Sequence, residues 1–208
     1  MQQQMPILKD LEAYAKANYI PICKPETADF LKMICAIKRP TRILEAGTAI
    51  GYSAIIMSEY LADNGMIDTI EIDEDRACLA RENIESAELS GKINVITADA
   101  VDVFSCLDKE YDIIFLDAAK SQYKQLFHDA KRLLNKGGIL ISDNIFYDGR
   151  VMNGRVAADI SRRHRTIVVN MREYLDILKN DKDLETNILS IGDGIAVSIL
   201  AGTGIKYE

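Results

Sequence analysis

The chain has 208 residues, of which 48% are hydrophobic, and it carries a formal net charge of −7. A core can therefore be buried in a single domain over residues 1–208, and the acidic balance disfavours indiscriminate binding of nucleic acid. No stretch approaches the ~20 apolar residues that span a bilayer, and the first residues lack the basic region of a secretory signal. We expect a cytoplasmic protein with no membrane partner.

The cysteines are far apart in the sequence, and none of them forms a C-x-x-C pair. This spacing argues against zinc binding and against a disulfide framework. We expect reduced thiols buried in the core at Cys23, Cys35, Cys78 and Cys106.

The order of the predicted elements favours an α/β fold. Helical patterns over about 7–18 and 26–37 open the chain and predict a helical cap within residues 1–38, followed by an α/β core over 39–208. In the core, strands are expected at 41–45, 66–72, 92–97, 111–116 and 138–142, and helices at 52–61, 74–87, 101–107, 121–134 and within 155–179. Two further strands, 186–190 and 195–200, are separated by the turn residues of Ile191-Gly-Asp-Gly194. The alternation predicts a doubly wound, mostly parallel sheet that ends in an antiparallel hairpin.

Two short apolar runs end in residues with side-chain oxygens: one run leads to Asp117, and the other to Asp143 and Asn144. Ligands of parallel sheets bind beyond the carboxyl ends of the strands, so these three side chains are expected to converge. Their oxygens suit Mg²⁺ or another divalent cation, and Lys120 could remove a proton from a substrate oxygen. The alternative is structural, with Asp117 capping a helix and Asp143-Asn144 forming a turn.

The first predicted strand leads into Glu45-Ala-Gly47-Thr-Ala49-Ile-Gly51-Tyr-Ser53, which is not the G-x-G-x-x-G of dinucleotide-binding proteins. Ser53 could donate a hydrogen bond to a ligand carboxylate, while Glu71 and Asp99 end later strands and could bind ribose hydroxyls and adenine. An adenosine with an amino-acid tail and no phosphate describes S-adenosyl-L-methionine. The candidate cofactor-binding residues are Glu45, Gly47, Ala49, Ser53, Glu71, Asp99 and Asp117.

A basic stripe lies between residues 150 and 172, with Asp159 as its only acid. Its members are Arg150, Arg155, Arg162, Arg163, Arg165 and Arg172, with His164 among them. Such a stripe could bind the phosphates of a single-stranded RNA loop, or it could be a solvated helix face. Neither His128 nor His164 has a second ligand at metal-binding spacing.

In combination, these motifs resemble the metal-dependent O-methyltransferases of the catechol and caffeoyl-CoA type, over residues 11–200. The resemblance rests on Leu-Glu-Ala-Gly-Thr-Ala-Ile-Gly-Tyr-Ser, Ile-Glu71-Ile-Asp, Phe-Leu-Asp117-Ala-Ala-Lys120, Asp143-Asn144 and Ile-Gly-Asp-Gly194. It implies a seven-stranded, Rossmann-like class I methyltransferase and a homodimer. It also implies that Asp117, Asp143 and Asn144 hold Mg²⁺, that Lys120 is the general base, and that Glu71 and Ser53 hold the ribose and the methionine end of the cofactor.

Within that family, the chain is similar to the bacterial enzymes that methylate 5-hydroxyuridine in tRNA. The likeness rests on the Leu11-Glu-Ala-Tyr-Ala-Lys segment, Asp148-Gly149 and the cluster from Arg162 to Arg165. It implies the wobble uridine of a tRNA anticodon loop as the substrate and 5-methoxyuridine as the product. A small phenolic substrate of the catechol or caffeoyl-CoA kind is the alternative. A nicotinamide-dependent dehydrogenase and a binding module without catalysis are two further alternatives.

Overall fold

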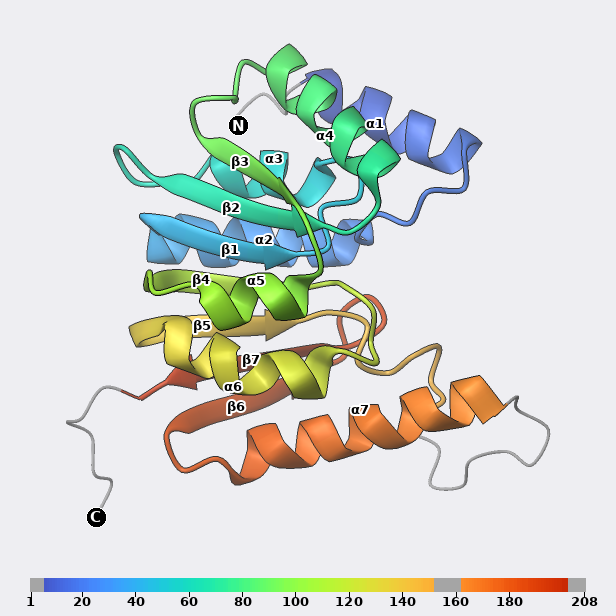
Figure 1. Ribbon diagram of the computed structural model, residues 1–208, viewed down its shortest axis with the longest axis vertical. Helices are drawn as coiled ribbons and strands as arrows, with labels where there is room; N and C mark the ends of the chain where they lie inside the picture. The colour runs from blue at the N-terminus through green and yellow to red at the C-terminus, as the bar shows by residue number, and fades with distance from the viewer. Residues whose placement is uncertain (1–5, 152–161, 202–208) are drawn as a thin grey trace. The chain divides into compact units, whose positions relative to one another are not determined.

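The computed structural model describes residues 6–151 and 162–201, which form two compact units that meet in sequence at residues 100 and 101 (Figure 1). Within the described residues, no helix combines the length and the apolar character needed to cross a lipid bilayer.

The first unit is a three-stranded parallel sheet with helices packed on it. In chain order its elements are α1 (Pro6–Ala17), α2 (Pro25–Lys38), β1 (Arg42–Ala46), α3 (Tyr52–Ser58), β2 (Met66–Glu71), α4 (Glu74–Ser86) and β3 (Ile93–Thr97). The strand order is β3-β2-β1, with Ile67 of β2 opposite Ile43 of β1 and Ile93 of β3. Four of the five residues of β1 are buried, as expected of a strand that is covered on both faces. Helices α1 and α2 pack on α3, and α4 packs on β3 and β2.

The second unit is a four-stranded mixed sheet. Its elements are α5 (Ala100–Cys106), which begins at the last residue of the first unit, then β4 (Tyr111–Leu116), α6 (Tyr123–Leu133), β5 (Leu134–Ser142), α7 (Arg162–Asn180), β6 (Leu184–Leu189) and β7 (Ile195–Leu200). The strand order is β4-β5-β7-β6, in which β5 runs parallel to β4 and antiparallel to β7. Helix α7 packs against α6 and β6 (Figure 1).

The predicted fold class is confirmed, because the chain supplies a seven-stranded, mostly parallel sheet that ends in the antiparallel pair β6 and β7. Several boundaries differ from the predicted ones. Strand β5 begins at Leu134, not at Gly138, and α6 begins at Tyr123 because a turn closed by Gln122 N–H to the carbonyl of Ala119 precedes it. The predicted division into a cap over 1–38 and a core over 39–208 stays a prediction.

The prediction that all four cysteines are buried was wrong for two of them. Cys23 and Cys35 are buried, but Cys78 and Cys106 are exposed. In α4 the buried residues are Ala77, Ala80 and Ile84, whose spacing defines one face of the helix, and Cys78 lies off that face.

The turn between β6 and β7 contacts the loop that follows β5. Gly194 N–H donates to the carbonyl of Ile191, and Ile145 N–H donates to the carbonyl of Gly194. Gly194 has a φ of 86°, and a Cβ at this position would lie 2.5 Å from Cγ of Phe146. Both the conformation and the close approach therefore require glycine.

We expect Gly194→Ala to destabilise the protein more than Gly149→Ala. Gly149 also has a positive φ, 74°, but a Cβ there would meet nothing within 4 Å, so this variant isolates the conformational cost. The clash at residue 194 should add about 1–3 kcal/mol to that cost in urea unfolding. Equal losses in the two variants would mean that Phe146 moves aside freely.

Candidate active site

In the first unit, the loop between β1 and α3 has an unusual backbone that Glu71 holds in place. Gly47, Ala49 and Gly51 have positive φ values of 105°, 46° and 88°. Ala49 is strained because it has a side chain, and its N–H donates to Oε2 of Glu71 at 2.8 Å. The other oxygen of Glu71, Oε1, accepts from Asp73 N–H at 3.1 Å. A single carboxylate at the end of β2 therefore fixes the backbone of two segments, the loop after β1 and the residues after β2.

Glu45 lies under this loop and has no exposed surface. Its Oε1 accepts from the Ser53 hydroxyl and its Oε2 from the Thr69 hydroxyl, both at 2.5 Å. Thr69 Oγ1 is in turn 2.6 Å from Thr48 Oγ1. The pKa of Glu45 is raised to about 7: burial raises it most and the charge of Glu71 also raises it, while the hydrogen bonds from the two hydroxyls lower it. These four polar side chains form a buried network that joins β1, β2, the loop and α3.

The cofactor-binding residues predicted in this unit surround the same loop. Glu45, Ser53 and Glu71 are buried, while Gly47, Ala49 and Asp99 are partly exposed. Asp99 directly precedes α5. The small residues leave the loop backbone open to a ligand, and each Glu71 oxygen keeps a further lone pair for a hydroxyl donor. The residues present thus fit the sugar and the amino-acid tail of a nucleoside ligand, and their roles stay predictions.

In the second unit, the three predicted metal ligands lie together at the ends of β4 and β5. Asn144 Nδ2 donates to Oδ1 of Asp117 at 3.1 Å, and Asn144 N–H donates to Oδ1 of Asp143 at 2.8 Å. Asp143 is 1% exposed, and Asp117 and Asn144 are partly exposed. Asn144 has a φ of 56°, a conformation that asparagine tolerates better than most residues.

Tyr123 of α6 fixes the ends of the two strands relative to each other. Its hydroxyl lies 2.8 Å from the carbonyl of Leu116 and 3.0 Å from that of Asp143. The ring is fully buried and meets the ring of Tyr174 edge to face, with 5.5 Å between the centroids. Burial, with the negative charges of Asp117 and Asp143, raises the pKa of Tyr123 well above its usual range. No pattern in the sequence pointed to a contact of Tyr123 with both carbonyls.

The donor set fits a hard cation, because two carboxylates and an amide oxygen are the ligands that Mg²⁺ prefers. The amide of Asn144 need only turn over to present its oxygen in place of its nitrogen. Among the described residues, no group of three or more His, Cys, Asp or Glu side chains could hold a metal ion. The predicted set therefore depends on its amide, and its role as a metal site stays a prediction. Lys120 lies in the turn between β4 and α6 and is partly exposed.

Tyr147, in the loop after β5, contacts His164 in the first turn of α7. Tyr147 and Asp148 have φ values of 50° and 53°. The Tyr147 ring stacks on the His164 ring at 5.6 Å, and its hydroxyl is hydrogen-bonded to Nδ1 of His164. The guanidinium of Arg150 lies 5.2 Å from the centre of the Tyr147 ring and pairs with Asp148. The sequence did not indicate this aromatic and cationic stack, because His164 lies 17 positions from Tyr147 along the chain.

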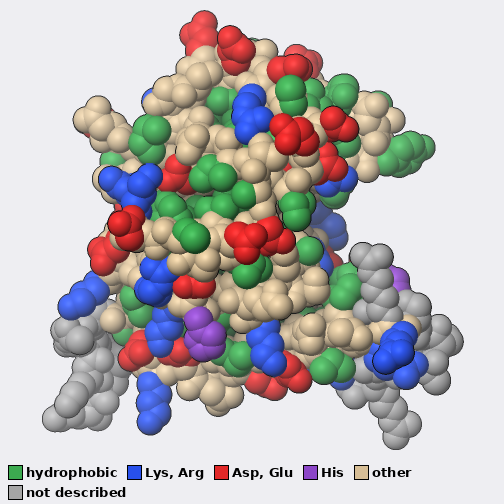
Figure 2. All heavy atoms as spheres, in the orientation of Figure 1, with side chains coloured by type: hydrophobic (Ala, Val, Ile, Leu, Met, Phe, Trp, Pro, Cys, Tyr) green, Lys and Arg blue, Asp and Glu red, His purple; other side chains and the backbone are tan. Residues whose placement is uncertain are grey.

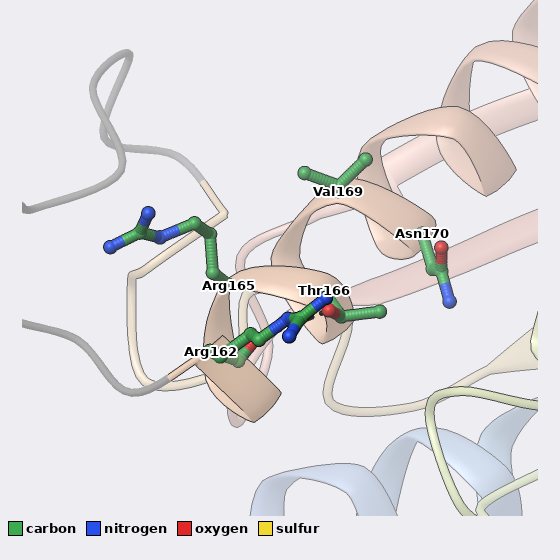
Figure 3. A pocket seen from close by; sticks show the side chains of 5 residues that line it. All are labelled: Arg162, Arg165, Thr166, Val169 and Asn170. Atoms are coloured by element: carbon green, nitrogen blue, oxygen red, sulfur yellow. Dashed lines mark hydrogen bonds between the residues drawn. The ribbon is translucent and has the colours of Figure 1, made fainter.

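The basic stripe is partly described. Arg162 and Arg165 are exposed on the first turns of α7, where Figure 2 shows a group of basic side chains. They border a groove of about 490 Å³, which is drawn in Figure 3. Its lining residues are Arg162, Arg165, Thr166, Val169 and Asn170. Arg172 instead donates from Nε to the carbonyl of Val151. Arg155 and the side chain of Arg163 lie outside the described residues.

Comparison with known proteins identifies the class of enzyme. The model of the O-methyltransferase family matches residues 2–200. A caffeoyl-CoA O-methyltransferase of Populus kitakamiensis is 30% identical over 81% of this chain and 73% of its own length. A catechol O-methyltransferase of Niastella koreensis is 35% identical over 62% of this chain, and the match spans only 60% of that enzyme.

Solved structures agree. A candidate caffeoyl-CoA O-methyltransferase of Staphylococcus aureus has a TM-score of 0.87 and 33% identity, and the match covers 96% of this chain and 94% of that one. An O-methyltransferase of Bacillus cereus in complex with SAH has a TM-score of 0.84 and 26% identity, over 96% and 93% of the two chains. The fold and the matched sequence define an enzyme of the S-adenosylmethionine-dependent methyltransferase class. The chain belongs to the O-methyltransferase family.

We expect Glu45 to make the stability of the protein pH-dependent. Since its pKa in the folded protein is about 7 against an ordinary 4.5, the folded state holds this proton more tightly than the unfolded state. The free energy of unfolding should then fall as the pH rises from about 4.5 to about 7, by at most about 3 kcal/mol from this group. Urea unfolding between pH 5 and 8 measures the change.

In Glu45→Gln that fall should be reduced, whereas the exposed α4 variant Glu85→Gln should behave like the wild type. Parallel pH profiles for the wild type and Glu45→Gln would show that Glu45 is already ionised throughout this range.

Proposed function

We propose that this O-methyltransferase uses S-adenosylmethionine and Mg²⁺, or another divalent cation, to methylate the 5-hydroxyl of wobble 5-hydroxyuridine in tRNA. The observation that carries the proposal is the oxygen cluster of Asp117, Asp143 and Asn144, which Tyr123 anchors at the ends of two strands. A substrate that offers two neighbouring oxygens suits such a cluster. O4 and the O5 hydroxyl of 5-hydroxyuridine are such a pair.

The loop after β1 would bind the cofactor. Relatives whose structures contain SAH share this fold, which supports the assignment. Glu71 would accept hydrogen bonds from the ribose hydroxyls, since its carboxylate is held rigid by two backbone N–H groups. Ser53 would bind the amino-acid end, and Asp99 would border the adenine.

Asp117, Asp143 and Asn144 would hold the cation. When bound, it would supply charge that lowers the pKa of the substrate hydroxyl and fixes the direction of its oxygen. Tyr123 keeps the carbonyl ends of β4 and β5 at a constant separation, so the two carboxylates that follow them are positioned before any ligand arrives.

Lys120 would take the proton from the substrate hydroxyl. It lies three residues after Asp117 in the turn before α6, and the structure shows no hydrogen bond or ion pair that commits its amine among the described residues. When bound, S-adenosylmethionine would supply the methyl group, which the deprotonated substrate oxygen would accept: the C–O bond would form as the C–S bond breaks, and the electron pair of that bond would go to sulfur, leaving a neutral thioether.

The groove on α7 supports an RNA substrate over a small one. Arg162 and Arg165 present two cations at its border, and Thr166 and Asn170 add polar groups, as a phosphodiester backbone requires. Tyr147, His164 and Arg150 add flat surfaces on which an unstacked base could lie. The alternative, a small phenol with vicinal oxygens, is favoured by the names of the relatives, which act on catechol or caffeoyl-CoA.

Metal dependence gives the first test of the proposed chemistry. We expect EDTA to abolish methyl transfer from labelled S-adenosylmethionine, and Asp143→Asn to lower it about 100-fold, because a cation ligand is lost. Asp63→Asn, in an exposed loop of the first unit, is the matched control and should retain full activity. Circular dichroism should show that both variants are folded. Transfer that resists EDTA in the wild type would refute the metal-dependent mechanism.

The substrate class is tested by charge reversal on α7. We expect the double variant Arg162→Glu, Arg165→Glu to raise the KM for tRNA that carries 5-hydroxyuridine by about tenfold or more, with steep salt dependence in the wild type. Lys179→Glu reverses one charge at the other end of α7, about 20 Å away along the helix, and should have no effect. Label on catechol alone, or equal KM values in all variants, would favour the small-molecule enzyme.

A further inference from the structure

The chemistry proposed above gives no role to the proton of Glu45. This carboxyl group has no exposed surface, yet it lies directly beneath Ser53, the residue proposed to hold the amino-acid end of the cofactor. The distances of 2.5 Å on both sides of the carboxyl group are those of strong O–H···O bonds. The number of hydroxyl protons in this network determines whether Ser53 can donate a hydrogen bond to a ligand.

When Glu45 is ionised, all of these protons are committed. A carboxylate only accepts, so Ser53 and Thr69 must each donate their single proton to it. Thr48 must then be the donor to Thr69. In this state the Ser53 oxygen can accept a hydrogen bond from a ligand but has no proton left to donate to a ligand carboxylate.

When Glu45 is protonated at Oε1, the bond to Ser53 reverses. The carboxylic acid donates to Ser53 Oγ across the same 2.5 Å, while Thr69 continues to donate to Oε2. The proton of Ser53 is then free to point away from Glu45. Ser53 is 7% exposed, so its hydroxyl is not sealed from a ligand in the loop.

We propose that Glu45 is a positioning residue for cofactor binding: its proton reverses the Ser53 hydrogen bond, so that Ser53 donates to the cofactor carboxylate only when Glu45 is neutral. This inference rests on the proposed binding of S-adenosylmethionine at Ser53. It deepens that proposal by making affinity for the cofactor depend on one buried proton.

The surroundings of Glu45 place its ionisation in the physiological range. Of the groups that face it, Ser53 of α3 and Thr69 of β2 lower its pKa, burial raises it most, and Glu71 of β2 is the charged neighbour that raises it further, to about 7. Among the described residues, no ion pair includes Glu45. The affinity for the cofactor should therefore fall as the pH rises through about 7.

The test is isothermal titration of the full chain with SAH at pH 6, 7 and 8.5, using the wild type, Ser53→Ala and Glu45→Gln. The amino group of the ligand itself titrates near pH 8, so the informative quantity is the ratio of wild-type affinity to Ser53→Ala affinity at each pH. A hydrogen bond to a charged group is worth about tenfold in affinity, so we expect that ratio to be about ten at pH 6 and close to one at pH 8.5.

Glu45→Gln separates the proton from the carboxyl shape. The amide can donate on one side and accept on the other but cannot ionise. The ratio of the SAH affinity of Glu45→Gln to that of Ser53→Ala should therefore be constant with pH, whichever way the amide is turned. A merely structural role for Glu45 would change affinity by the same factor at every pH. Circular dichroism at each pH checks that the variants are folded.

The outcomes are distinguishable. This inference would be overturned if the ratio of wild-type affinity to Ser53→Ala affinity did not change with pH, or if Glu45→Gln kept the wild-type pH dependence. In either case, binding of SAH would still support the proposed cofactor. Failure of the wild type to bind SAH at any of these pH values would overturn the proposed cofactor and this inference with it.

Discussion

The hydrogen bonds of the Tyr123 hydroxyl to the carbonyls of Leu116 and Asp143 are the constraint on which the proposed chemical site depends. Parallel strands need not end level with each other, and the loops that follow them are free to diverge. The hydroxyl of a buried tyrosine on α6, which contacts the last carbonyl of β4 and the carbonyl directly after β5, removes this freedom. Asp117 and Asp143 then lie at positions that the core of the protein fixes.

In the first unit, buried carboxylates hold the candidate binding loop in place. Glu71 holds the strained backbone of Ala49, and Glu45 holds the hydroxyls of Ser53 and Thr69. The two acids differ in surroundings: Glu45 has no exposed surface, whereas Glu71 is 7% exposed and is bonded by backbone N–H groups. Neighbouring acids therefore serve different purposes, one as a rigid acceptor and the other as a buried group that can gain or lose a proton near neutral pH.

The fold was predictable because its signals are local. Apolar runs of five or six residues, separated by helical periods, identify the strands, and Gly-Asp-Gly194 identifies the final turn. The acids at the strand ends could also be found, since each follows its strand directly. The network of Glu45 with Thr48, Ser53 and Thr69 could not be found, because its contacts join residues 8 to 24 positions apart, which no periodicity encodes. Cys78 was misjudged for a related reason: composition suggests that cysteine is buried, but the face of α4 decides.

The backbone conformation of Asn144 limits which residues can occupy this position. The residue must adopt a φ of 56° and at the same time reach Asp117 with a short polar side chain. Glycine meets the first demand but supplies no oxygen, and glutamine or glutamate carries the oxygen on a longer chain that favours other backbone conformations. Asparagine and aspartate are left, and they differ by one unit of charge. Exchange between these two residues is thus a short route by which a related enzyme could change the charge of the proposed cation site without rebuilding the loop.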